Sequence, residues 1–325
     1  MKNHKRIDRK KEYILIAIAF LLALYSIVSI VLKRKNIPAK PENPSSSQAV
    51  SAISTPEALS SLTPSALSAP PSKSPPKSPS PKSVPPSSSD PRTNPSAYQK
   101  LYPDLSVKKS KVAPPSQDKI VYLTFDDGPS KLTIPLLNVL DDYQVKATFF
   151  LIGKTDSADL KAMKEIVNRG HAVGVHSYTH IYDQIYANPV AFLDDFKKMH
   201  DLIQKTTGVN THIYRFAGGS LNSHNKKTAK AIISEMNRRG FTYFDWNVES
   251  GDAETGTSAA SIYQNAVTGA SRNRQSVILF HNAAGKKSTL AEMPRIIETL
   301  KEQGYRFATL NDSLDNSSYI FKGKS

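Results

Sequence analysis

The stretch IVYLTFDDGPSKLTIPLLNVLDDYQVKATFFLIG, residues 120–153, decides the fold class of this 325-residue chain. It opens on an apolar run that predicts a strand, continues through an amphipathic run that predicts a helix, and ends on a second apolar strand. A strand, a helix and a strand in this order are typical of two parallel strands joined by a helical crossover.

The same alternation continues to residue 310. Further strands are predicted at 171–176, 214–217, 241–246, 276–280 and 305–310. Helices are predicted between them at 160–170, 188–208, 226–240 and 290–304, and each of these runs ends in Gly, a frequent helix stop. The pattern predicts an α/β domain with a mainly parallel sheet, which an open doubly wound sheet and a (β/α) barrel both satisfy. In either fold, functional groups gather where strands end.

Residues 13–32, YILIAIAFLLALYSIVSIVL, carry no charge. A helix of about 20 such residues spans a hydrocarbon core of about 30 Å. The heavier basic cluster precedes this run, within residues 1–12, which predicts a cytoplasmic N-terminal tail and an extracellular remainder. We expect an uncleaved, single-pass anchor in the cell membrane. A cleaved signal peptide, which would give a secreted protein, is the alternative.

Residues 33–97 are dominated by Pro, Ser and Ala. Such a segment buries too little apolar surface to offset the entropy of ordering it, so it is predicted to be a disordered stalk, extended by its prolines. A lead-in segment at 98–117 precedes the predicted catalytic domain at 118–325. The stalk favours a substrate close to the cell's own surface.

The net charge of +15 is concentrated in the N-terminal part. Residues 1–116 hold 18 lysines and arginines against 6 acidic residues, a net charge of +12. Anionic membrane or wall polymers are the partners that such an arm favours, and nucleic acid is not expected because no groove-reading motif accompanies the charge. The chain has no cysteine, which excludes disulfides, thiolate metal sites and cysteine nucleophiles.

Chemistry-bearing residues follow the predicted strands. Asp126 and Asp127 come after the first strand, on a turn with Gly and Pro, and two adjacent carboxylates on one turn point in different directions. His176 and His180 follow the strand at 171–176, and their spacing of four places both imidazoles together. Two histidines, one aspartate and an open fourth position are the layout of a catalytic zinc site. An ordinary turn and a surface histidine pair are the alternatives.

Weaker signals follow other strands. His281 ends the strand at 276–280, Arg215 opens the run RFAGGS, and Trp246 and Asp252 lie in the segment after the strand at 241–246. Taken alone, each of these residues is weak evidence for a functional site. Their shared position after successive strands, at the edge where sites form, makes them candidates together.

From about residue 98 to residue 310 the chain resembles the NodB-homology polysaccharide deacetylases, carbohydrate esterase family four. The resemblance rests on TFDDGP at 124–129, HSYTH at 176–180, Arg215 with its two glycines, the 246–252 segment and Leu-Phe-His at 279–281, in family order. It implies a distorted (β/α) barrel and the hydrolysis of N-acetyl groups from an N-acetylhexosamine polymer of the cell wall or surroundings. Peptidoglycan is the first expectation, by similarity to membrane-anchored peptidoglycan N-acetylglucosamine deacetylases.

The resemblance also implies residue roles at the metal and the base. Asp127, His176 and His180 would bind a divalent metal, usually zinc or cobalt. Asp126 would be the general base and Arg215 would orient it.

The remaining implied roles concern the acid and the pocket. His281 would be the general acid, with Asp252 tuning its pKa. The backbone N–H of Gly218 would stabilise the oxyanion. Trp246 and Leu279 would shape the pocket for the acetyl methyl group.

Three positions depart from the family pattern: Ala217 replaces a frequent proline, Ala253 a frequent aromatic residue, and Asn282 a frequent aspartate. They leave the shape of the substrate pocket and the pH profile open. Two other functions fit the sequence: an esterase that removes O-acetyl groups from xylan, and a catalytically silent module that binds wall glycans. A missing metal ligand or base would favour the silent module, and all of them are present.

Overall fold

The structure, a computed structural model, describes residues 94–114 and 116–319. The expected cytoplasmic tail, the membrane anchor and nearly all of the stalk lie outside the described residues. Within the described ranges, every helix is too short or too polar to cross a bilayer.

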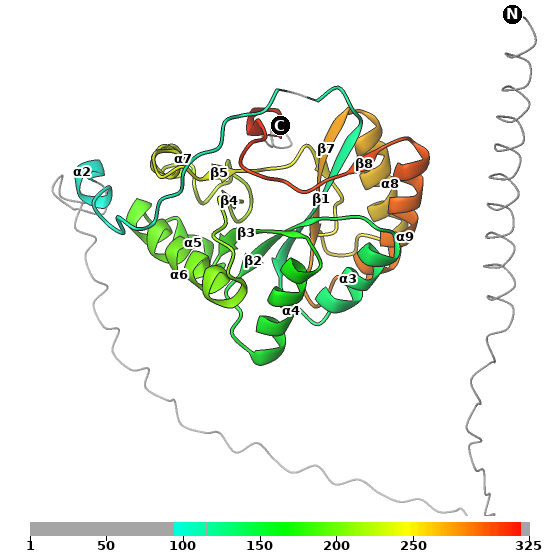
Figure 1. Cartoon of the computed structure of the whole chain (residues 1–325), viewed down its shortest axis with the longest axis horizontal. Helices are drawn as coiled ribbons and strands as arrows, with labels where there is room; N and C mark the ends of the chain where they lie inside the picture. The colour runs from blue at the N-terminus through cyan, green and yellow to red at the C-terminus, as the bar shows by residue number, and fades with distance from the viewer. Residues whose placement is uncertain (1–93, 115, 320–325) are drawn as a thin grey trace, which may run out of the picture. The chain divides into compact units, whose positions relative to one another are not determined.

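Within the described residues, eight parallel strands form one curled sheet, a half-barrel (Figure 1). The strand order is β5-β4-β3-β2-β1-β7-β6, and β8 adds to β1 beside this path. The strands are β1 (Ile120–Gly128), β2 (Thr148–Ile152), β3 (Ala172–Ser177), β4 (Ile213–Tyr214), β5 (Thr242–Tyr243), β6 (Val248–Glu249), β7 (Gln275–His281) and β8 (Arg306–Phe307). The expected parallel α/β architecture is confirmed, and its curl agrees with a distorted (β/α) barrel.

Helices connect the strands along the convex face (Figure 1). They are α3 (Thr133–Asp142), α4 (Ser157–Asn168), α5 (Tyr182–Ile185), α6 (Pro189–Thr207), α7 (Ala229–Arg238), α8 (Ala259–Ser271) and α9 (Lys287–Glu302). The short helix α2 (Pro95–Tyr98) precedes the sheet, and the 3₁₀ helix η1 (Asn316–Tyr319) follows it. The sequence did not predict α5 or α8.

The strand expected at 241–246 is present but shorter than expected: β5 covers only residues 242–243, and β6 begins beyond it, at Val248. The buried guanidinium of Arg215 changes the course of the backbone between these two strands. The carbonyl oxygens of Phe244 and Asp245 accept hydrogen bonds from the Arg215 guanidinium, at 2.8 and 2.9 Å, instead of pairing with another strand.

Side chains of β1 alternate between two cores. Val121, Leu123 and Phe125 belong to the large core between the sheet and the helices, while Ile120 and Tyr122 belong to a smaller core on the concave face. Because successive strand side chains point to opposite faces, residues 124 and 126 share the concave face. The catalytic candidates of β1 therefore stand at the end of the concave core.

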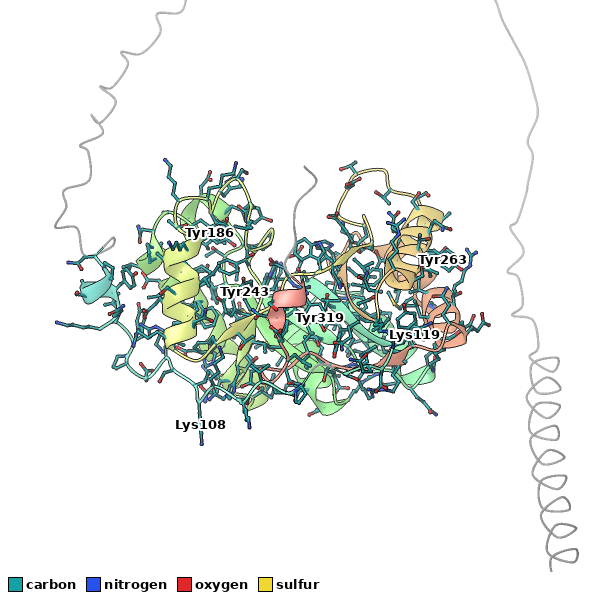
Figure 2. All side chains as sticks on the ribbon, turned by 90° about the horizontal axis from the view of Figure 1, so that it is seen from above. Lys108, Lys119, Tyr186, Tyr243, Tyr263 and Tyr319 are labelled. Atoms are coloured by element: carbon teal, nitrogen blue, oxygen red, sulfur yellow. The ribbon has the colours of Figure 1, made fainter. Side chains whose placement is uncertain are left out.

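The C-terminal helix η1 bridges β5, at one end of the strand order, and β7, the strand next to the other end. The amide of Asn316 donates to the carbonyl oxygen of Tyr243, in β5, at 2.8 Å. The hydroxyl of Tyr319 donates to the side chain of Gln275, in β7, at 2.6 Å. Figure 2 labels Tyr319, which lies in η1, and Tyr243, whose carbonyl oxygen accepts from Asn316. This bridge buries Tyr319 in the concave core.

The lead-in segment packs on the domain through one buried arginine. The Arg239 guanidinium donates to four backbone carbonyl oxygens of this segment, those of Tyr98, Leu101, Tyr102 and Leu105, at 2.7 to 3.4 Å. Tyr98 and Leu105 belong to the main core. The folded unit therefore includes residues that precede the first strand.

Candidate active site

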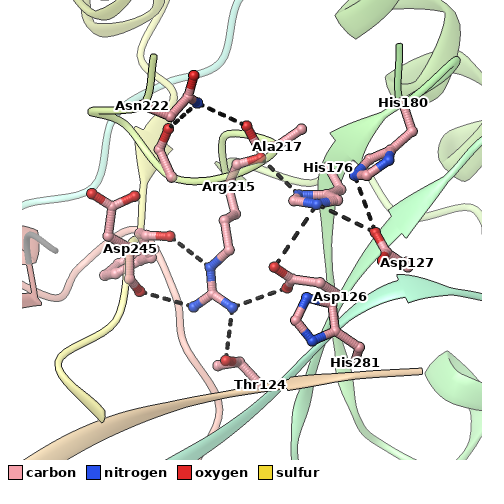
Figure 3. Close-up of polar contacts among 12 residues, drawn as sticks. Thr124, Asp126, Asp127, His176, His180, Arg215, Ala217, Asn222, Asp245 and His281 are labelled. Carbon is pink, nitrogen blue, oxygen red and sulfur yellow. Dashed lines mark hydrogen bonds and ion pairs between the residues drawn. The ribbon is translucent and has the colours of Figure 1, made fainter. Parts of the chain in front are cut away.

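The candidate residues gather at the carboxyl ends of the parallel strands. Asp126 and Asp127 lie at the end of β1, His176 near the end of β3, and His281 at the end of β7. Arg215 directly follows β4. Because parallel strands end at one edge of the sheet, side chains far apart in the sequence meet there (Figure 3).

Three of these residues form a compact group of potential ligands. One ligand atom each from Asp127, His176 and His180 lies within 4.8 Å of the other two. Asp127 Oδ1 is 3.2 Å from His180 Nε2 and 3.6 Å from His176 Nε2. The three ligand atoms converge on one point (Figure 3). Two imidazole nitrogens and one carboxylate oxygen are a donor set that zinc prefers.

The contacts of this triad fit a bound cation. Asp127 Oδ1 is buried and forms no hydrogen bond among the described residues, which is costly without a positive partner. His176 Nδ1 lies 3.0 Å from the carbonyl oxygen of Arg215. Since a carbonyl oxygen only accepts, Nδ1 carries the proton and Nε2 keeps a lone pair for a ligand bond.

The electrostatics of His180 favour its ligand form. Burial lowers the pKa of this side chain below its ordinary value, and the nearby His176 lowers that pKa further, against the opposing effect of Asp127. The neutral imidazole, which is the form that binds metals, therefore predominates at neutral pH.

Two of the three ligand candidates adopt an unusual backbone conformation. Asp127 has φ 67° and His180 has φ 55°, in the left-handed region that residues other than glycine rarely occupy. Such conformations persist only where the surroundings enforce them, and they concentrate at functional sites. The backbone geometry thus marks the same two residues as the ligand geometry.

Asp126 is held by a buried arginine. Arg215 Nη1 donates to Asp126 Oδ1 at 3.0 Å and to the hydroxyl of Thr124 at 2.7 Å. The guanidinium is fully buried and stacks on Phe150, 4.3 Å from the ring centroid. Asp126 Oδ2 lies 3.8 Å from His176 Nε2. Asp126 is therefore fixed beside the triad while the arginine holds its other oxygen.

His281 stands next to Asp126, because the two residues are register partners in the parallel pair of β1 and β7. Its Nδ1 lies 2.7 Å from Asp252 Oδ1. The other carboxylate oxygen accepts from the backbone N–H of His281 at 2.9 Å and from the hydroxyl of Thr289 at 2.8 Å. Asp252 is thus locked against the histidine ring.

This pairing determines the protonation of the ring. Burial lowers the pKa of His281, but the hydrogen bond and the negative charge of Asp252 outweigh burial, so its pKa is raised above the ordinary value. Burial raises the pKa of Asp252, but its hydrogen bonds with His281 and the charge of that ring lower it on balance. The pair favours a protonated imidazole beside an ionised carboxylate.

The turn after Arg215 leaves the residue Gly218 exposed. Gly218 has φ 76°, and Gly219 has φ 87°. A Cβ added at Gly219 would lie 3.2 Å from the indole ring of Trp246, so glycine lets the turn pack on this ring. Trp246 and Leu279 are both buried in the concave core beneath the site.

The three departures from the family pattern have distinct surroundings. Ala217 is buried, and its carbonyl oxygen accepts from the hydroxyl of Tyr186 at 2.8 Å. Ala253 is exposed. Asn282 is buried, and its backbone N–H donates to the carbonyl oxygen of Asp126 at 2.7 Å. Asn282 therefore supports the aspartate turn from β7.

Several supporting residues were not predicted from the sequence. Thr289 braces Asp252, Thr124 shares the Arg215 guanidinium, and Tyr182 packs its ring 5.3 Å from that of His180. Asp195 binds the loop that carries His180. A signal for Asp195 existed: on the predicted helix it occupies the apolar face, between core residues 192 and 196.

Comparisons with known proteins show which family this chain resembles. Residues 113–239 match the family described as polysaccharide deacetylase. The Bacillus subtilis protein YheN, whose name classes it with the polysaccharide deacetylases, is 35% identical over 65% of this chain and 74% of its own length. A peptidoglycan-N-acetylglucosamine deacetylase of Bacillus cereus is 35% identical over 63% of this chain and 76% of its own length. The crystal structure of the catalytic domain of a peptidoglycan N-acetylglucosamine deacetylase from Eubacterium rectale matches with a TM-score of 0.60 and 38% identity, covering 64% of this chain and 95% of that chain.

Proposed function

This chain belongs to the polysaccharide deacetylase family, and on that premise we propose that it removes N-acetyl groups from peptidoglycan with the help of a divalent metal ion. The observation that carries the proposal is the meeting of three groups at one edge of the sheet. These groups are the triad of Asp127 with two histidines, the Asp126–Arg215 pair and the His281–Asp252 pair.

In this proposal Asp127, His176 and His180 hold the cation. Zinc is the first expectation because of the donor set, and cobalt is the alternative. When bound, such an ion makes water more acidic and polarises the acetyl carbonyl.

Asp126 is proposed to accept the proton of the attacking water while the water oxygen bonds to the acetyl carbon. Its position beside His176 and its bond with Arg215 support this role, since the arginine keeps one oxygen oriented and leaves the other to the substrate. The backbone N–H of Gly218, an exposed residue, would donate to the oxygen that gains negative charge. Trp246 and Leu279 would contact the acetyl methyl group.

His281 is proposed to donate its proton to the sugar nitrogen as the C–N bond breaks, because an amine cannot leave as an anion. The products are acetate and a free amino sugar. The raised pKa of His281, which Asp252 sustains against burial, supports this role at neutral pH. An ester needs less protonation of its leaving group, so this pair favours an amide substrate over acetylated xylan.

Peptidoglycan is further supported by the names of two relatives, from Bacillus cereus and Eubacterium rectale. We propose an anchor at residues 13–32 with a cytoplasmic N-terminus, a stalk at 33–97 and an extracellular domain that works in the wall. The basic N-terminal part would attract anionic membrane or wall polymers.

Acetate release tests the proposal. The full-length chain is offered peptidoglycan, N-acetylglucosamine oligomers and acetylxylan at equal acetyl concentrations, with and without added zinc. The proposal expects the fastest release from peptidoglycan and a loss of release after metal removal. Preference for acetylxylan would favour the esterase, and zinc-loaded protein that binds glycan without releasing acetate would favour the silent module.

A further inference from the structure

One buried carboxylate organises the loop between the two histidine ligands. Asp195, in the middle of α6, accepts hydrogen bonds from the backbone N–H groups of Tyr178 and Thr179, at 2.7 and 2.9 Å. It also accepts from the hydroxyls of Ser177 and Thr179, at 2.8 and 2.7 Å. Four donors from three consecutive residues therefore converge on one side chain.

These four hydrogen bonds use all the acceptor positions of the Asp195 carboxylate. Each Asp195 oxygen receives two donors, which matches the acceptor capacity of an ionised carboxyl group. Asp195 is 8% exposed and lies among core side chains of α6. Within residues 94–114 and 116–319, no basic side chain forms an ion pair with it. The loop thus supplies the polar contacts that make burial of this charge tolerable.

The contacts reach His180 through Ser177. The Ser177 hydroxyl donates to Asp195 and accepts from the backbone N–H of His180 at 2.8 Å. His180 has φ 55°, a backbone conformation that is strained for a residue other than glycine. The hydrogen bonds of residues 177–179 and of the His180 N–H keep the loop in that conformation, and with it the direction of the His180 ring.

We propose that Asp195 is a positioning residue that holds His180 in its ligand conformation before the cation binds. The inference rests on the proposed metal binding by Asp127, His176 and His180. Without Asp195, the loop at 177–180 would lose its shared acceptor, and ordering it would oppose metal binding. The negative charge of Asp195, held against the loop between the two histidine ligands, also favours a cation nearby.

The test measures zinc affinity of the metal-free, full-length chain by competition with a chelating dye. Asp195→Asn replaces one acceptor oxygen by a donor, so two of the four loop donors lose their partner. Removing supports of this kind weakens metal binding by about 10- to 100-fold. Asp194→Asn is the matched control, because Asp194 makes the same charge change on the same helix but accepts from Tyr102 in the lead-in segment.

The expected result is weaker zinc binding for Asp195→Asn and unchanged binding for Asp194→Asn, with both variants melting cooperatively. Wild-type affinity in a folded Asp195→Asn overturns the inference. If Asp195→Asn does not fold, Thr179→Val and Thr179→Ser decide, since valine removes one donor to Asp195 and serine restores it. Equal affinity in these two variants also overturns the inference.

A second readout separates this inference from the proposed function. Amide hydrogen exchange at Tyr178 and Thr179 is measured in the metal-free protein, where Asp195→Asn should speed exchange and Asp194→Asn should not. Wild-type protein that binds no zinc would refute the proposed metal site. Unchanged exchange in Asp195→Asn would refute the positioning role of Asp195.

Discussion

Replacing Arg239 by methionine should destabilise the folded unit but leave the zinc content of the active site unchanged. The Arg239 side chain is 2% exposed and pairs with Glu235, which is 1% exposed, at 2.6 Å. Methionine preserves much of the volume and removes every donor. Glu235 and four backbone carbonyl oxygens of the lead-in segment would then lose a buried partner.

The size of the effect follows from these contacts. Breaking one side of a buried ion pair costs about 3–5 kcal/mol of unfolding free energy, and the lower end applies because Arg238 still bonds to Glu235. For a domain of this size, 1 kcal/mol shifts the melting temperature by about 2–4 °C, so a fall of about 6–12 °C is expected. Zinc content should match wild type, since the contacts of Arg239 go to α7 and the lead-in segment.

Thermal unfolding followed by circular dichroism measures this prediction, with Arg238→Met as the matched control. The Arg238 side chain is 47% exposed, so its bonds with Glu235 compete with water and its loss should cost about 1 kcal/mol or less. A melting temperature for Arg239→Met within about 2 °C of wild type, a shift worth about 1 kcal/mol or less, would refute the reasoning. So would equal losses in the two variants.

Three further predictions follow from the site and the lead-in segment. Asp252→Asn removes the negative charge that raises the pKa of His281, so His281 should lose its proton at a lower pH than in the wild type. The fall of kcat/KM on the alkaline side of the pH profile should therefore move to lower pH. If that fall does not move, His281 is not the general acid. His180→Ala removes one of three ligand atoms, so zinc content and acetate release should fall together, and normal turnover with stoichiometric zinc would contradict the triad. A chain cut to residues 117–325 should melt below one cut to 94–325, because it lacks the buried Tyr98 and Leu105; equal melting temperatures would show that the lead-in segment adds nothing.

Much of the fold could be predicted because long apolar runs dominate it. β1, β2 and β7 are buried on both faces, as parallel strands between two cores are, and their sequences are correspondingly continuous in apolar residues. The helix α8 escaped prediction because its sequence, AASIYQNAVTGAS, mixes small and polar residues without a charged face. The break between β5 and β6 depends on Arg215, which lies far away in the sequence.

The reactive residues of the candidate site could be predicted from the sequence, but the residues that hold them in place could not. Asp126, Asp127 and His281 stand at strand ends, where the topology of a parallel sheet brings them together. Asp195 and Thr289 lie in the helices α6 and α9, and they form hydrogen bonds with the loop before His180 and with Asp252, respectively. Their partners depend on tertiary packing, which periodicity does not encode. A polar residue on an apolar helix face was the single local signal for Asp195.

The central claim is that the two adjacent aspartates have different roles, Asp126 as the general base and Asp127 as a metal ligand. A comparison of Asp126→Asn with Asp127→Asn tests this claim most directly. Bound zinc, melting temperature and acetate release are measured on the same samples. We predict that Asp127→Asn loses metal and activity together. Asp126→Asn should keep its metal and its fold while turnover falls by about 10²–10⁴, the usual contribution of a positioned base. Full turnover by Asp126→Asn with zinc in place would contradict the account.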